Sequence, residues 1–396
     1  MSCDGRFGRI SMRMIAISMA AWALSAVVAR AAETAATAEP VMPPDMRRVA
    51  RKIEPDLKGD PARLAQYVNF FSRELGNDSR MCAFDVTCEP RGKKVVLHGF
   101  VEFPETRKSL IEFLSALGFE IENQMESLPA DDLGTEIFGI TKVTHSYCFD
   151  RPTGKRKQET DCLLGEPVFL LREHDGQLLV HSHEGYLGYV PSKDIVRMDE
   201  DRFSKYLDGP RVLVAADQKS SKPAIPAGAR LKWVSTDGDQ VAVELPTGDK
   251  VKIAAADCHV NEAPAAKIDE IIETAKKLLG TPYFWGGRTS EGIDCSGLVQ
   301  QSYASVGLFL PRDAYQQFYV GQLSATRWHM AGLRRGDMLY FLASDGKIRH
   351  TAIYLGNDKF IQAVMPHAKI SSFNPKDPEY DAVHKASFAF AKRLLD

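Results

Sequence analysis

The sequence predicts a multidomain α+β protein, and three observations support this class. The 396 residues are enough for two to four domains that each bury a core of their own. Hydrophobic residues make up 44% and charged residues 26%, a composition that is typical of globular proteins and excludes a disordered or collagen-like chain. The pattern also changes along the chain: helices alternating with strands come first, then short strands divided by turns, then a helix followed by a strand hairpin.

The balance of charge limits the partners that we expect. Fifty Lys and Arg residues stand against 52 Asp and Glu residues, which gives a formal charge of −2. Such a chain has no strong field to hold a polyanion. We therefore expect neither nucleic acid nor an anionic membrane surface as a partner.

The first 31 residues have the pattern of a secretory signal peptide. Arg6, Arg9 and Arg13 precede an apolar run over residues 14–29, and Ala29-Arg30-Ala31 supplies small residues in A-x-A spacing. The apolar run is shorter than the roughly 20 residues that a membrane-spanning helix needs. We expect cleavage after this segment, export to the periplasm or the extracellular space, and no stable insertion into the membrane.

Export would place the remaining cysteines in an oxidising compartment. Two local disulfides are plausible, Cys82 with Cys88 and Cys148 with Cys162, and each would contribute about 2–3 kcal/mol if unstrained. Zinc binding is the alternative, although no C-x-x-C or H-x-x-x-H cluster accompanies these thiols. Two cysteines, Cys258 and Cys295, remain without a plausible disulfide partner. Cys295 lies in the C-terminal segment that contains the candidate catalytic residues.

Residues 32–60 are polar and contain several prolines, so we expect an exposed lead-in. Residues 61–130 then follow the order helix, strand, strand, helix, strand. The helices are expected around 64–75 and 110–117, and the strands at 83–88, 95–103 and 119–123. This order of helices and strands, together with the sequence KKVVLHGFVEFPETRKSLIEFLSALGFEIEN, resembles a BON-type module. The resemblance implies binding or spacing in the cell envelope rather than catalysis.

Residues 131–205 predict a small closed barrel. Strands are expected at 167–172, 177–182 and 187–190, linked by Asp-Gly and Glu-Gly turns. The segment resembles the bacterial SH3-type fold, and GYLGYVP at 185–191 carries the resemblance. Residues 206–262 repeat the pattern more weakly and predict a second barrel of this type. Such barrels are usually binding or positioning modules.

The last domain, residues 263–396, contains a candidate nucleophile. Asp294-Cys295-Ser296-Gly297 opens a predicted helix that runs to about residue 306, so Cys295 lies in its first turn with Asp294 as the cap. Helix amides and the helix dipole stabilise a thiolate there, so we expect a lowered pKa and a nucleophilic Cys295. The same amides can donate to a developing oxyanion. The alternative is a buried structural cysteine.

The strand hairpin that follows contains a candidate base. Strand alternation places His350, Ala352 and Tyr354 on one face. A three-residue loop at 356–358 would pair Ala352 with Gln362, and Gln362 would then lie diagonal to His350 on that face. An even loop would turn Gln362 to the opposite face. On the same face, Gln362 could accept a hydrogen bond from the imidazole and fix its tautomer, as the third member of a triad does.

Five blocks in this domain together resemble the NlpC-type, papain-like cell-wall peptidases over about residues 265–395. The blocks are YFWGG at 283–287, GIDCSGL at 292–298, LPRDA at 310–314, LRRGDM at 333–338 and HTAIYLG at 350–356. The resemblance implies a papain-like α+β fold and a cysteine hydrolase with Cys295 as nucleophile, His350 as general base and Gln362 as the orienting residue. The family often has His at the third position, so Gln362 is a departure. No metal or organic cofactor is implied.

The barrels that precede this domain make the chain similar to the YkfC-like subgroup, which cleaves γ-D-glutamyl-diaminoacid bonds in murein peptides with a free N-terminal L-Ala. In that subgroup the first barrel closes one end of the cleft, and its acidic and tyrosine side chains help to bind the amine. By motif position these residues are Glu166 and Tyr186, and Asp294 could supply a second carboxylate. Tyr283 and Ser296 complete the expected substrate-binding set.

Two alternatives from other functional classes stay open at this point. A non-catalytic cell-wall-binding protein could use the peptidase fold as a scaffold; the Cys295 and His350 pair speaks against this, whereas Gln362 leaves it open. A murein amidase that cuts the sugar–peptide junction is the other, and an occluding first barrel disfavours it.

Overall fold

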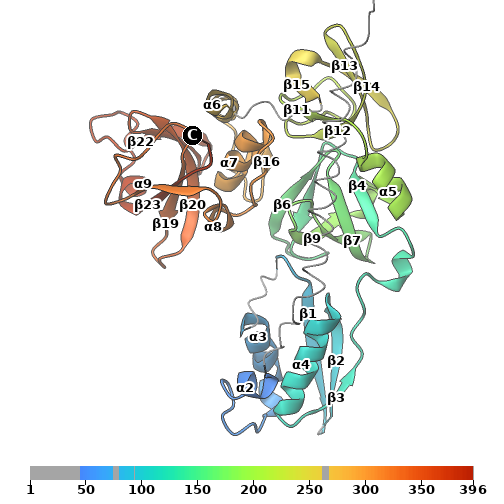
Figure 1. Cartoon of the computed structure of the whole chain (residues 1–396). Coiled ribbons are helices and arrows are strands. Elements are labelled where there is room, and N and C mark those ends of the chain that lie inside the picture. The colour runs from blue at the N-terminus through green and yellow to red at the C-terminus, as the bar shows by residue number, and fades with distance from the viewer. Residues whose placement is uncertain (1–44, 75–79, 93, 261–266, 396) are drawn as a thin grey trace, which may run out of the picture.

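The computed structural model describes residues 45–74, 80–92, 94–260 and 267–395. Figure 1 shows an N-terminal unit (45–126), a first β domain (138–207), a second β domain (211–260) and a C-terminal domain (267–395). The mixed α+β architecture confirms the predicted class, whereas the BON-type and SH3-type resemblances stay predictions. The predicted signal peptide lies outside the described residues. No helix in the described part of the chain is long and apolar enough to cross a membrane.

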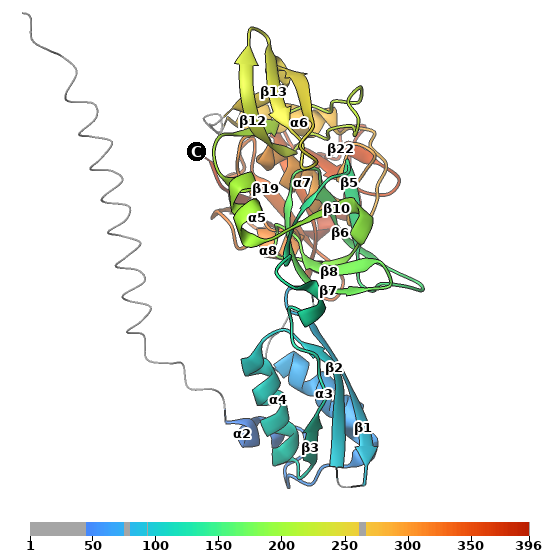
Figure 2. The ribbon, with the colours of Figure 1, turned by 90° about the vertical axis from the view of Figure 1, so that its right-hand side faces the viewer.

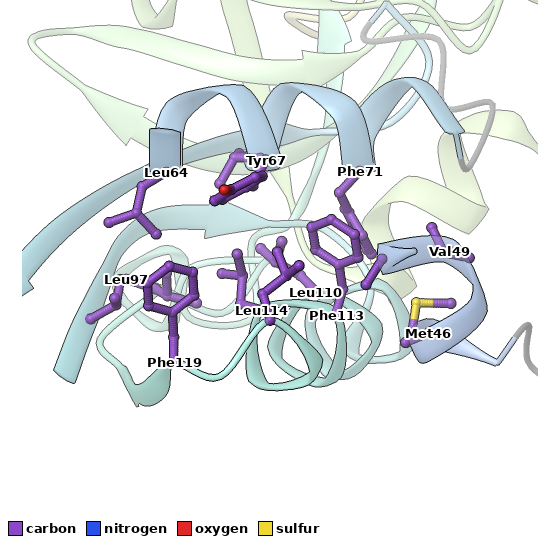
Figure 3. Packing of buried hydrophobic residues seen from close by; sticks show 14 of the residues in the cluster. Met46, Val49, Leu64, Tyr67, Phe71, Leu97, Leu110, Phe113, Leu114 and Phe119 are labelled. Atoms are coloured by element: carbon purple, nitrogen blue, oxygen red, sulfur yellow. The ribbon is translucent and has the colours of Figure 1, made fainter. Parts of the chain in front are cut away.

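The N-terminal unit has the predicted order of elements. Its three-stranded sheet runs β1-β2-β3, with β1 and β2 antiparallel and β2 and β3 parallel. Two helices cover it, and Figure 3 shows Tyr67 and Phe71 of one facing Phe113 and Leu114 of the other. The elements are α3 (Leu64–Glu74), β1 (Phe84–Arg91), β2 (Lys94–Val101), α4 (Pro104–Ala116) and β3 (Glu120–Asn123).

The predicted lead-in at 32–60 is not wholly exposed. Residues 32–44 lie outside the described chain, but α2 (Met46–Ala50) begins directly after the capping residue Asp45. Met46, Val49 and Ala50 are buried in the same core as α3 and α4 (Figure 3). Three apolar side chains in five residues are too few to show helical periodicity, so the sequence pattern missed this short helix.

The first β domain is one antiparallel sheet in the order β10-β4-β7-β8-β9-β5-β6. The three predicted strands correspond to β7, β8 and β9, and the helix α5 (Glu200–Leu207) packs against β4 and β10. The strands are β4 (Phe138–Thr141), β5 (His145–Phe149), β6 (Gln158–Leu163), β7 (Pro167–His174), β8 (Gln177–His181), β9 (Leu187–Pro191) and β10 (Ile195–Met198).

The second β domain is a smaller antiparallel sheet in the order β14-β13-β12-β11-β15. Its core is apolar and separate from that of the C-terminal domain. The strands are β11 (Arg211–Val214), β12 (Arg230–Asp237), β13 (Gln240–Glu244), β14 (Lys250–Ala254) and β15 (Cys258–Val260).

The C-terminal domain packs helices against a six-stranded antiparallel sheet in the order β18-β23-β19-β20-β21-β22. Leu298 and Val299 of α7 meet Ile353 of β20 and Ile361 of β21 in the core. The helices are α6 (Ile268–Lys277), α7 (Cys295–Ala304), α8 (Ala314–Gln317) and α9 (Ala382–Ser387). The strands are β16 (Arg288–Thr289), β17 (Gly292–Ile293), β18 (Gln322–Thr326), β19 (Met338–Leu342), β20 (Ile348–Gly356), β21 (Lys359–Ala363), β22 (Ala368–Ser372) and β23 (Phe388–Arg393).

The first β domain is the centre of the arrangement. The two views agree that the N-terminal unit extends from one end of it and that the C-terminal domain lies along its side (Figures 1 and 2). Ala83 and Phe100 of the N-terminal unit pack against Leu179 and its neighbours in the first β domain. Glu102 also pairs with His181 at 2.8 Å. The N-terminal unit is therefore docked on the sheet rather than merely tethered to it.

The predicted disulfides are wrong. None of the six cysteines that the structure describes is part of a disulfide bond. Cys148 lies opposite Thr160, so Cys162 is diagonal to it on the neighbouring strand; the two buried thiols form a hydrogen bond with each other but are not joined by a disulfide. The extended stretch from Phe84 to Cys88 spans about 13 Å and carries Cys88 away from Cys82.

Candidate active site

The candidate nucleophile lies where the sequence predicts it. Cys295 is the first residue of α7, and its side chain is buried, with 8% of the residue exposed. Asp294 is the N-cap and accepts a hydrogen bond from the backbone N–H of Gly297 at 2.7 Å. The sulfur accepts hydrogen bonds from the backbone N–H groups of Ser296 and Thr351. The second of these contacts brings Cys295 beside the strand that carries His350.

The candidate base and its partner share one face of the hairpin, as predicted. Nε2 of His350 lies 2.7 Å from Oε1 of Gln362. Ile353 pairs with Ile361, so Ala352 stands opposite Gln362 in the predicted register. Ala352 lies in the apolar cluster on the His350 side of the sheet, whereas Ile353 lies in the cluster on the other side.

The loop that produces this register differs from the predicted one. Gly356 pairs with Lys359, which leaves a two-residue turn at Asn357 and Asp358, whose φ values are 52° and 62°. The register shifts between Tyr354 and Gly356, so a bulge supplies the extra residue that an even turn lacks. A tight turn of this type matches the twist of the strands, and the bulge restores the face of Gln362.

A carboxylate behind Gln362 fixes the direction of its amide. Nε2 of Gln362 donates to Oδ2 of Asp381 at 3.1 Å and to Oγ of Ser371 at 2.9 Å. Burial opposes the charge of Asp381, but hydrogen bonds from the backbone and imidazole of His384 outweigh burial and lower the pKa of Asp381. An ionised carboxylate only accepts, so the amide nitrogen of Gln362 must face Asp381 and its oxygen must face His350.

This direction determines the tautomer of the imidazole. Because Oε1 of Gln362 accepts, Nε2 of His350 carries the proton and Nδ1 is left as the basic nitrogen. His384 also stacks beside His350, with 4.7 Å between ring centroids. Asp381 and His384 were not predicted from the sequence, because they follow Gln362 by 19 and 22 residues and match no motif.

Burial makes both reacting groups neutral at rest. It raises the pKa of Cys295 to about 12, and the charge of Asp294 adds to the effect; the two backbone hydrogen bonds and Arg312 act in the opposite direction but are weaker. Burial and the neighbouring His384 lower the pKa of His350 to about 4. The expected thiolate with a lowered pKa is therefore wrong for the resting site. The thiol keeps its proton until a reaction draws it to His350.

Asp294 and Ser296 are held by a buried arginine. Arg312, 1% exposed, donates to both oxygens of Asp294 at 3.0 and 2.7 Å and to Oγ of Ser296 at 2.9 Å. The backbone N–H of Gly286 adds a hydrogen bond to Asp294 at 2.8 Å. Asp294 thus lines the cleft with its charge already matched. Tyr283 is half-buried, and burial together with the charges of Cys295 and Asp294 raises its pKa. It is not among the described residues that line the cleft around Cys295, so its expected role in substrate binding stays a prediction.

Three units of the molecule line the cleft around Cys295. The C-terminal domain contributes Asp294, Ser296, Trp285, Asp313, Ala314, Tyr315, Ile348 and Arg349. The first β domain contributes Glu159 of β6, and the N-terminal unit contributes Arg80. The expectation that the first of the predicted barrels packs against the mouth of the cleft is therefore confirmed for the first β domain.

The structure corrects the expectation for Glu166. It is 4% exposed, and both of its oxygens are 3.0 Å from the guanidinium of Arg288. Glu184 pairs with the same arginine at 3.0 Å. Glu166 is outside the cleft lining and joins the first β domain to the C-terminal domain instead. Tyr186 is also buried, but its hydroxyl donates to Oδ2 of Asp313 and so reaches the lining indirectly.

Comparison with known proteins identifies the C-terminal domain. The model of the NlpC/P60 family matches residues 280–386, which contain Cys295, His350 and Gln362. The C-terminal domain is an NlpC/P60 domain. The prediction of an NlpC-type cysteine peptidase is thereby confirmed.

Relatives of the NlpC/P60 domain extend the comparison. A γ-D-glutamyl-L-lysine dipeptidyl-peptidase of Bacillus cereus is 28% identical over 319 residues, covering 74% of this chain and 93% of the relative. A murein DD-endopeptidase and LD-carboxypeptidase of Escherichia coli is 44% identical over 85 residues, covering 21% of this chain and 43% of the relative. A crystal structure of an NlpC/P60 family protein from Bacillus cereus superposes with a TM-score of 0.56 at 25% identity, covering 65% of this chain and all of that one.

Alkylation tests the protonation state of the NlpC/P60 thiol. Because the pKa of Cys295 is raised to about 12, the thiolate is a small minority at neutral pH and increases as pH rises. Its reaction with iodoacetamide should accelerate about tenfold per pH unit from about pH 6 to 9, with no plateau. The rate is measured by mass spectrometry, with Cys295→Ser to subtract the other thiols. A plateau below pH 8 would indicate an ion pair at rest.

Replacing Asp381 tests the fixed tautomer. In Asp381→Asn the amide of Gln362 is free to reverse and present its NH₂ to His350, which shifts the imidazole proton to Nδ1. Turnover should fall about 10- to 100-fold, with KM little changed. Asp377→Asn is the matched control, because Asp377 pairs with Lys359 and does not contact Gln362. Equal losses in both variants would show that Asp381 acts only on stability.

Glu166→Gln tests the buried junction between the domains. The substitution leaves the buried positive charge of Arg288 only partly compensated. The free energy of unfolding in urea should therefore fall by up to about 3–5 kcal/mol. The pKa of Glu166 is lowered to about 2, because Arg288 and His183 outweigh its burial. The stability that this group adds is therefore present above the unfolded pKa and is lost as pH falls towards about 2. Glu173→Gln, in a half-exposed pair, should cost less than about 1 kcal/mol.

Proposed function

We propose that the chain is an exported endopeptidase that hydrolyses γ-D-glutamyl-diaminoacid bonds in murein peptides with a free N-terminal L-Ala. One observation supports the specificity for a free amine: Glu159 of the first β domain and Cys295 of the NlpC/P60 domain line the same cleft. The relative named γ-D-glutamyl-L-lysine dipeptidyl-peptidase supports the choice of bond. Murein lies outside the cytoplasmic membrane, so this substrate agrees with the predicted signal peptide and with a periplasmic or extracellular location.

The geometry supports a mechanism with Cys295, His350 and Gln362 in the catalytic roles. Nδ1 of His350 accepts the proton of Cys295 as the sulfur attacks the γ-carbonyl of D-Glu, and Gln362 holds the imidazole that becomes charged. Backbone amides at the start of α7 donate to the oxyanion. The carbon–nitrogen bond breaks, the amine of the diamino acid takes the proton from His350, and water then hydrolyses the thioester with His350 as base.

The same geometry supports recognition of a free amine. The carboxylate of Glu159 is 9% exposed and has a single described ion pair, with Lys157 at 3.1 Å. Asp313, on the same lining, accepts from Tyr186. A cationic amine between these carboxylates is stabilised by their negative charges, whereas an acylated amine is neutral and gains no such interaction. In this proposal the amine-binding role expected of Glu166 passes to Glu159, with Tyr186 acting through Asp313.

A matched pair of peptides tests this function. L-Ala-γ-D-Glu-diaminopimelate should be cleaved with a kcat/KM about 10- to 1,000-fold higher than its N-acetylated form. Glu159→Gln should reduce that ratio, while Glu173→Gln, at a residue outside the cleft lining, should preserve it. Products are identified by mass spectrometry, and Cys295→Ala should abolish both reactions without unfolding the chain. Equal kcat/KM values for the two peptides in the wild-type enzyme would contradict amine recognition.

A further inference from the structure

A cation from the N-terminal unit occupies one side of the cleft. Arg80 precedes β1, and its side chain lies in the same lining as Cys295. Its backbone carbonyl accepts a hydrogen bond from the N–H of Leu187 at 2.6 Å, next to Tyr186. The N-terminal unit thus delivers a guanidinium group to a fixed point between the first β domain and the NlpC/P60 domain.

The surroundings of this guanidinium have the chemistry of a cation-binding subsite. It forms an ion pair with Asp313, and its Nη2 donates to the hydroxyl of Tyr315 at 3.0 Å. The rings of Tyr186 and Tyr315 lie 5.7 and 5.4 Å from the guanidinium carbon. One carboxylate with two aromatic rings is an arrangement that binds organic cations in general, an amine as well as a guanidinium.

The other carboxylates of the cleft have their own cations. Asp294 is bound by the buried Arg312, and Glu159 pairs with Lys157. Asp313 is thus the acidic residue of the lining whose charge Arg80 matches. Oδ2 of Asp313 accepts from both Tyr186 and Arg80, so an incoming amine would have to take the place of the guanidinium at that oxygen.

We infer that Arg80 is a built-in competitor for the substrate amine at the Asp313–Tyr186–Tyr315 subsite, so that the N-terminal unit sets the affinity of the enzyme for peptides with a free amine. The inference rests on the proposed function. A ligand that binds only when Arg80 has left shows an apparent affinity reduced by the fraction of molecules in that state.

The burial of the three arginines at this junction distinguishes a displaceable group from fixed ones. The side chain of Arg80 is 31% exposed and that of its partner Asp313 is 20% exposed. Arg312 and Arg288 are 1% and 3% exposed and hold carboxylates of similarly low exposure. A half-solvated ion pair contributes little to stability and exchanges readily, whereas a buried pair does not. Arg80 can therefore be displaced from Asp313 while the buried ion pairs of Arg312 and Arg288 keep the domains joined.

The test compares full-length wild-type enzyme with Arg80→Ala and Arg80→Gln on L-Ala-γ-D-Glu-diaminopimelate and its N-acetylated form. Removing the competitor should lower KM for the free-amine peptide about five- to tenfold, with kcat unchanged. KM for the acetylated peptide, which carries no competing charge, should change less than twofold. Arg91→Ala is the matched control, because Arg91 lies in the same unit, is exposed and pairs with Glu89.

Other results of these measurements would contradict either the competition by Arg80 or the proposed function. A rise in KM for both peptides would mean that Arg80 binds a substrate carboxylate, and an unchanged KM would mean that it only joins the domains; either result overturns the competition. Failure of the wild-type enzyme to cleave the γ-D-glutamyl bond would reject the proposed function instead. Should Arg80→Ala unfold, as seen by thermal melting, Arg80→Gln gives the same comparison, because it removes the charge but keeps the Cβ–Cγ–Cδ stem and a polar end.

Discussion

The buried ion pair between Arg312 and Asp294 is the interaction on which the rest of the site depends. The guanidinium binds both oxygens of Asp294 and the hydroxyl of Ser296, and its Nε donates to Thr160 of the first β domain at 3.0 Å. One side chain thereby sets the start of α7 and its position relative to β6. Because both partners are buried, loss of either would leave an uncompensated charge in the interior. The position of Cys295 follows from this pair.

Burial then decides how the chemistry starts. It raises the pKa of the thiol and lowers that of the imidazole, so the resting pair is neutral. A thiol in this state is less prone to oxidation than an exposed thiolate. The hydrogen bonds from Asp381 through Gln362 to His350 keep the basic nitrogen available for the moment when the substrate arrives.

In the proposed function, the cleft connects substrate choice to the arrangement of domains. Glu159 comes from the first β domain, Asp313 from the NlpC/P60 domain and Arg80 from the N-terminal unit. A change in the docking of any unit would alter the charge that an incoming peptide meets, without any change in the catalytic residues. The apolar contact of Ala83 and Phe100 with the first β domain, together with the Glu102–His181 pair, therefore matters for specificity although it lies outside the cleft lining.

Local patterns in the sequence determined many of the elements and the two candidate reacting residues. Helical spacing predicted α3, a capped helix start predicted the place of Cys295, and strand alternation predicted the common face of His350 and Gln362. Tertiary structure alone decided the partners that lie far along the chain: Arg288 binds Glu166 across 122 residues, and Arg80 reaches Asp313 across 233. It also decided the protonation states. Periodicity reports which face of an element is buried, but pKa values and charge pairing depend on which distant groups are buried together, and no local pattern contains that information.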